Sequence, residues 1–79
     1  MTLSILALDK ILFKGEAKSV SAPSLSGVVQ ILNNHIPLIT PLKKGVLKVI
    51  ESSGKELKFE IKRGILDVRN NNKVVALLR

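Results

Sequence analysis

An alternation of apolar and charged residues from Lys55 to Lys62 constrains the fold more than any other feature of the sequence. In this segment Leu57, Phe59 and Ile61 alternate with lysine and glutamate residues. A period of two places the apolar side chains on one face of a β-strand, so the segment is predicted to form a half-buried strand. The apolar, β-branched run at residues 45–50 and the glycine in the intervening link predict that the two segments form an antiparallel hairpin.

Short strand-like segments recur along the rest of the chain. Residues 64–69 and 73–78 flank an Asn-Asn-Asn turn, which predicts a second hairpin because asparagine tolerates the left-handed backbone of tight turns. Residues 3–8 and 16–22 are also strand-like, and a bend or bulge is predicted between them near Gly15. No long stretch carries an apolar stripe at helical spacing without glycine or proline. Many short strands separated by regular turn signals predict an all-β sandwich or barrel.

The chain has 79 residues, enough for one domain, which we expect to span residues 1–79. Hydrophobic residues make up 46% of the chain, and Phe13 and Phe59 are its only aromatic residues, so the core is predicted to be aliphatic. Cysteine is absent, so hydrophobic packing must hold the domain together without disulfides. The apolar stretch at residues 1–9 is far shorter than the roughly 20 residues that span a bilayer, and it is interpreted as a strand of a cytosolic protein.

The chain is strongly basic, with 13 lysine and arginine residues against 6 acidic residues and a formal net charge of +7. Such a charge favours nucleic acid, an anionic membrane surface or an acidic protein as a partner, and its sign alone does not choose among them. A small basic β-barrel that binds single-stranded nucleic acid is therefore an alternative interpretation. The aromatic platform on which such proteins stack bases is missing, because the sequence has no tyrosine or tryptophan.

Residues 32–45 contain the only histidine, His35, and two of the three prolines, Pro37 and Pro41. Because proline lacks a backbone N–H, this segment is predicted to be an exposed edge or loop. The Asn-Asn pair before His35 is predicted to form a turn that lifts the imidazole to the surface. A single histidine without cysteine argues against a metal site. No Gly-x-Ser-x-Gly turn or phosphate-binding glycine loop occurs, so we expect no catalytic residues and no cofactor.

Several short motifs follow one another along the chain: Asp9-x-x-Leu-Phe-x-Gly-Glu16, Ser19-Val-x-x-Pro23, His35-x-Pro-Leu-x-Thr40 and Gly64-Ile-Leu-Asp-Val68. In this order they resemble the N-terminal domain of the epsilon subunit of bacterial F-type ATP synthases. The resemblance implies a two-sheet sandwich of about ten short, mostly antiparallel strands. It also implies a non-catalytic rotor subunit that binds the gamma subunit and the c-ring and couples rotation to ATP synthesis. Such a subunit lies in the central stalk, at the cytoplasmic face of the bacterial plasma membrane.

The resemblance also indicates where the subunit interface lies. The residues that it assigns to contacts with the gamma subunit and the c-ring are Ala7, Gly27, Val28, Val29, Asn33, Asn34, His35, Pro37 and Thr40. Val28 stands where many relatives have an acidic residue that helps to contact the basic c-ring loop, so no salt bridge is expected there. Most relatives continue past the position of Arg79 into a C-terminal helical hairpin, and we expect a short form without that helical domain.

Overall fold

The computed structural model describes residues 1–79, and its regular secondary structure consists of β-strands alone. The strands are β1 (Thr2–Ala7), β2 (Lys10–Ser24), β3 (Gly27–Leu32), β4 (Leu38–Leu42), β5 (Gly45–Glu51), β6 (Glu56–Ile61), β7 (Gly64–Arg69) and β8 (Lys73–Leu78). The all-β fold predicted from the sequence is confirmed, with eight strands in place of the slightly larger number expected. The structure contains no helix of the length and apolar character needed to cross a membrane.

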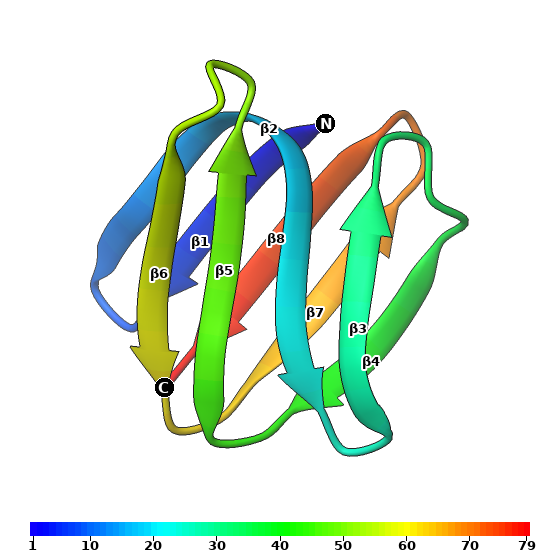
Figure 1. Cartoon of the computed structure of the whole chain (residues 1–79). Helices are drawn as coiled ribbons and strands as arrows, with labels where there is room; N and C mark the ends of the chain where they lie inside the picture. Colours follow the sequence, from blue (N-terminus) through cyan, green and yellow to red (C-terminus); the bar gives the residue numbers. More distant parts are fainter.

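Two layers of strands face each other across the core (Figure 1). The first layer contains β6, β5, the second half of β2, and β3. The second layer contains β1, β8, β7 and β4. β1 pairs with β8 in parallel, and the other strand pairs are antiparallel. The mostly antiparallel pairing expected from the sequence is therefore confirmed.

β2 is the longest strand, and it joins the two layers. Its first half pairs with β1, and its second half pairs with β3 and β5. A register shift between Ala17 and Ser19 marks a β-bulge, which bends a strand and increases its twist. The sequence predicted a bend or bulge near Gly15. Gly15 itself pairs with Leu3 and the strand continues through it, while register shifts occur on both sides of it, between Phe13 and Ile11 and between Ala17 and Ser19. The layers therefore form one continuous hydrogen-bonded sheet that is folded over itself.

The core between the layers is aliphatic, as the composition predicted. Along each strand inward-facing residues alternate with outward-facing ones, and Leu3 of β1, Leu47 of β5 and Leu66 of β7 are fully buried. Phe13 and Phe59 are partly buried and pack against this core. Complete burial of one large aliphatic side chain contributes roughly 1.5–3 kcal/mol. The core therefore fixes both the position and the orientation of the strands whose outer faces meet solvent.

The strand registers define two ends of the sandwich. At the end drawn lowest in Figure 1, Ala7, Leu78, Gly64 and Leu42 form one row across the second layer. The β1–β2, β2–β3, β4–β5 and β6–β7 turns lie at this lower end. The β3–β4, β5–β6 and β7–β8 turns lie at the upper end.

Candidate functional site

The interface residues predicted from the sequence are distributed over both ends of the sandwich. Gly27 and Val28 begin β3 at the lower end, beside the β2–β3 turn. Asn33, Asn34 and His35 follow the last residue of β3 at the upper end. The full length of β3 separates the two groups, so the predicted residues do not form one contiguous patch.

The predicted residues also differ in accessibility. Val28 points outward and is 77% exposed, whereas Val29 points inward and packs against the core. Ala7, at the end of β1, also packs against the core. Pro37 is exposed just before β4, and Thr40 is half-buried within that strand. Gly27, Asn33 and Asn34 are exposed as well, so a partner can reach these three residues, Val28 and Pro37 without rearrangement.

Hydrogen bonds connect the β3–β4 turn to the β7–β8 turn at the upper end. The backbone N–H of Asn34 donates to Oδ1 of Asn72 at 2.7 Å, and Nδ2 of Asn72 donates to Oδ1 of Asn33 at 3.4 Å. The amino group of Met1 also donates to Oδ1 of Asn33. Asn34 and Asn72 have positive φ angles of 61° and 58°, a conformation that asparagine tolerates. The asparagine turns predicted from the sequence are present, and their amides hold the upper end together.

His35 is half-buried at the upper end, beside Val68 and Asn72. Its Nδ1–H donates to the carbonyl oxygen of Ile36 at 2.7 Å, and its backbone N–H donates to the carbonyl oxygen of Leu32 at 3.2 Å. The histidine therefore reinforces its own turn, while Nε2 has no hydrogen bond within the chain. The structure has no group of three His, Cys, Asp or Glu side chains that could hold a metal ion.

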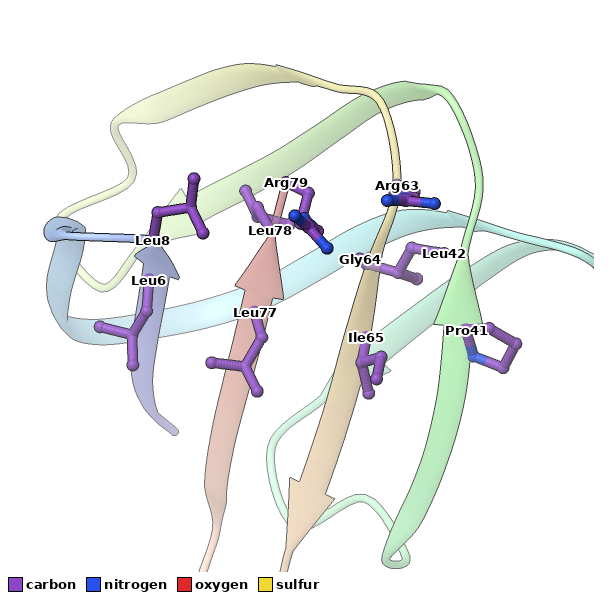
Figure 2. Close-up of a pocket in the computed structure, with 10 residues that line it drawn as sticks. All are labelled: Leu6, Leu8, Pro41, Leu42, Arg63, Gly64, Ile65, Leu77, Leu78 and Arg79. Atoms are coloured by element: carbon purple, nitrogen blue, oxygen red, sulfur yellow. The ribbon is translucent and has the colours of Figure 1, made fainter.

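An apolar surface that was not predicted from the sequence covers the outer side of the second layer. Strand pairing aligns outward-facing apolar side chains in one row across β1, β8, β7 and β4 (Figure 2). With their neighbours on β2 and β4, they form what we call the apolar face: Leu6, Ile11, Ile39, Pro41, Ile65 and Leu77. Ile39 is 73% exposed, Ile65 45% and Leu77 46%. The apolar face therefore presents large aliphatic side chains from several adjacent strands to solvent.

A shallow groove of about 650 Å³ lies in the lower part of the apolar face (Figure 2). Arg63 and Arg79 border it, and both are exposed and outside any ion pair. Leu77 and Leu78 of β8 line part of the groove. Residues 74–78 of that strand are all apolar, so both of its faces are apolar. This uninterrupted run is a sequence signal for an apolar outer surface on β8, although it does not specify which neighbouring strands extend that surface.

The chemical character of the apolar face fits binding to another protein surface. The outer side of the first layer is more polar, with Ser21, Gln30, Lys48 and Lys58 in register on neighbouring strands. Its exposed apolar side chains, Val28, Leu32 and Val46, lie around this polar row. Soluble monomeric proteins rarely expose large contiguous apolar patches, and such patches mark interaction sites. The apolar face is therefore the candidate docking surface of this chain.

Comparisons with known proteins identify relatives along almost the whole chain. The family model described as "ATP synthase, Delta/Epsilon chain, beta-sandwich domain" matches residues 1–77. The chain is 44% identical over 71 residues to the ATP synthase epsilon chain of Clostridium kluyveri, which covers 90% of this chain and 54% of that protein. It is 38% identical over 74 residues to the ATP synthase epsilon chain of Chlorobaculum tepidum, with 94% of this chain and 84% of that protein covered. The chain thus spans about half the length of the Clostridium kluyveri relative.

The fold also has a counterpart among solved structures. A chain in the cryo-EM structure of the Euglena gracilis mitochondrial ATP synthase, which contains OSCP, F1 and the c-ring, superposes with a TM-score of 0.92 at 22% identity. The superposition covers 99% of this chain and 49% of that chain, and at this identity it establishes the fold alone. The family model over residues 1–77 and the identity to the two bacterial relatives show that the chain belongs to the β-sandwich domain family of ATP synthase delta and epsilon chains.

Proposed function

We propose that this chain is the β-sandwich of a non-catalytic, epsilon-type subunit in the central stalk of an F-type ATP synthase. In this position it binds the gamma subunit and the c-ring at the cytoplasmic face of the bacterial plasma membrane. It couples rotation of the stalk to ATP synthesis by transmitting force between these neighbours. The observation that carries the proposal is the family match over residues 1–77, which includes nearly every residue of the chain.

The apolar face is the surface that we assign to the gamma subunit. Stable interfaces between subunits have apolar centres, and the side chains of Ile65 and Leu77 lie near the middle of the apolar face. These side chains stand on strands that are fixed by the core beneath them, so little conformational entropy is lost when a partner covers them. Both features favour a lasting contact of the kind that a rotating stalk requires.

The lower end is the surface that we assign to the c-ring. Val28 lies there with 77% of its surface exposed, at the position that the resemblance assigns to the c-ring contact. An apolar contact by Val28 takes the place of the salt bridge that an acidic residue would form. The turn that contains Asn33 and His35 lies at the opposite end, and we assign it to a separate contact within the stalk.

Co-purification of the tagged chain with the gamma subunit of the same synthase tests the assignment of the apolar face. Ile65→Lys places a charge in the middle of that face. Val46→Lys is the matched control, because Val46 is 49% exposed against 45% for Ile65 but lies on the outer side of the first layer. We expect Ile65→Lys to weaken gamma binding by at least about tenfold, since it removes an aliphatic contact and buries an unpaired ammonium group. Val46→Lys should leave binding unchanged.

Val28→Lys tests the c-ring contact in the same way, by recovery of the rotor from solubilised membranes. We expect less c-ring to be recovered with this variant than with the wild-type chain. Urea unfolding midpoints close to the wild-type value will show that the exposed substitutions preserve the fold. A wild-type chain that does not co-purify with gamma would contradict the proposed function. Equal gamma binding by Ile65→Lys and Val46→Lys would contradict the choice of face.

A further inference from the structure

The lower end of the sandwich carries a cluster of positive charge. Lys43 and Lys44 lie in the β4–β5 turn, and Lys62 and Arg63 lie in the β6–β7 turn (Figure 1). All four side chains are exposed, and none takes part in an ion pair within the chain. We call these four residues the cationic cluster.

Strand pairing brings the two turns of the cationic cluster together. β4 pairs with β7, and β5 pairs with β6, up to the residues that flank these turns. Lys44 and Lys62 border one shallow hollow of about 430 Å³, together with Glu60. Asp9, in the β1–β2 turn, is a second acidic residue at this end. Lys10 at the start of β2 and Arg79 after β8 are further cations at this end, so six basic side chains against two acidic ones leave the lower end with a net positive charge.

Two leucines project from other turns at the same end. Leu8 in the β1–β2 turn is 83% exposed, and Leu25 in the β2–β3 turn is 70% exposed. The upper end differs, because its turns consist mainly of asparagine, serine and glycine residues and contain a single lysine, Lys55. Ile36, which is 74% exposed, is the most exposed large hydrophobic residue there. Positive charge and protruding leucines therefore occur together only at the lower end.

We propose that the lower end binds the surface of an anionic phospholipid bilayer. The cationic cluster contacts the lipid phosphates, and Leu8 and Leu25 enter the boundary between the headgroups and the acyl chains. Basic side chains are attracted to an anionic leaflet, and aliphatic side chains that reach the acyl boundary are removed from water. This inference goes beyond the proposed function: it concerns the lower end of the free chain, which the c-ring would cover in the assembled stalk.

The positions of the leucines favour a bilayer over an acidic protein or a nucleic acid. Leu8 borders the groove of the apolar face, whereas Leu25 stands on a separate turn away from it. A bilayer accepts aliphatic side chains at any point of its surface, but a protein partner needs a matched pocket for each of them. Proteins that bind single-stranded nucleic acid stack its bases on aromatic side chains, and the turns of the lower end contain none.

Vesicle sedimentation with the purified chain tests the proposal. We expect the chain to bind vesicles of phosphatidylglycerol and phosphatidylcholine, and to bind phosphatidylcholine vesicles only weakly. High salt should release it, because dissolved ions screen the attraction. Lys43→Glu combined with Lys44→Glu reverses the charge of half the cationic cluster. Lys55→Glu combined with Lys73→Glu is the matched control, because it changes the net charge equally but at the upper end.

The lower-end charge variant should bind the anionic vesicles at least about 25-fold more weakly than the wild-type chain. Each basic residue near the surface contributes about fivefold to the affinity, and two are removed. The upper-end variant should retain most of the binding. Leu25→Ser should weaken binding by about tenfold through the loss of aliphatic burial. Ile36→Ser is its control, matched in exposure at the opposite end, and should have no effect. Circular dichroism of each variant will show that the fold is intact.

Three results would overturn the proposal. Equal losses for the two charge variants would mean that net charge alone attracts the chain to vesicles. Full binding by Leu25→Ser would mean that no side chain enters the bilayer and that the lower end recognises polyanions in general. An acidic protein or an oligonucleotide that binds this end while anionic vesicles do not would also exclude the bilayer as the ligand.

Discussion

Replacing Gly64 by alanine tests how closely β7 and β8 pack beneath the apolar face. A Cβ atom added at Gly64 would lie 2.4 Å from the backbone carbonyl oxygen of Leu77 and 3.0 Å from Cδ2 of Leu78. Since Cβ atoms essentially never come within 3.0 Å of another heavy atom, something must shift. The side chain of Leu78 can rotate, but the carbonyl group of Leu77 is held in the paired strands. The two strands must therefore separate locally.

The expected cost follows from this geometry. Overpacking a close-packed site costs about 1–3 kcal/mol. Alanine also restricts the unfolded chain, which offsets about 0.4–1 kcal/mol of that cost. We therefore expect Gly64→Ala to lower the free energy of unfolding by about 1–2 kcal/mol. A domain of this length has a total stability of roughly 4–12 kcal/mol, so the loss is a substantial fraction of it.

Urea unfolding followed by circular dichroism measures the effect. With a denaturant dependence of about 1 kcal/mol/M, the midpoint of Gly64→Ala should fall by about 1–2 M. Gly15→Ala is the matched control, because Gly15 also lies in a strand but a Cβ there meets only the ring of Phe13, at 3.4 Å. Its midpoint should stay the same or rise slightly. Equal midpoints for the two variants would refute the reasoning, since the steric difference between the sites is the whole cause of the expected difference.

Two further substitutions test the core and the upper end. Leu47→Ala opens a cavity at a fully buried position and should lower the free energy of unfolding by about 2–5 kcal/mol, as measured by urea unfolding. Val46→Ala, at the neighbouring exposed position, should change it by less than about 0.5 kcal/mol. Asn72→Gly preserves the positive φ but removes the amide that bonds Asn34, and should cost about 0.5–1.5 kcal/mol. A thermal unfolding temperature equal to that of the wild type would show that this amide link does not stabilise the upper end.

Local patterns in the sequence were sufficient to predict the two hairpins. The alternation that ends at Lys62 predicted β6 and its pairing with β5, because such an alternation arises when one face of a strand is buried and the other is solvated. The asparagine turn predicted the pairing of β7 with β8 in the same way. The edge character expected for residues 32–45 is also confirmed. β4 pairs with β7 along its length but with β2 only at Leu42.

Features that depend on distant pairing could not be read from local patterns. Gly15 indicated a bend or bulge between two separate strands, but β2 continues through it because β1 supplies a hydrogen-bonding partner. The separation of Gly27 from His35 depends on β3 forming a strand between them, and no strand was predicted there. The apolar face depends on the register of four strands, which no single segment of the sequence specifies. Whether the predicted interface residues contact gamma and the c-ring stays a prediction for the binding experiments.

The continuity of β2 through both layers has a mechanical consequence. Tension applied to the second layer reaches the first layer along the covalent backbone of one strand, in addition to the side-chain contacts of the core. Packed side chains slide past one another under loads that covalent bonds withstand. The two layers therefore resist shear as a unit. A shaft that rotated one layer would rotate the other with little elastic deformation between them.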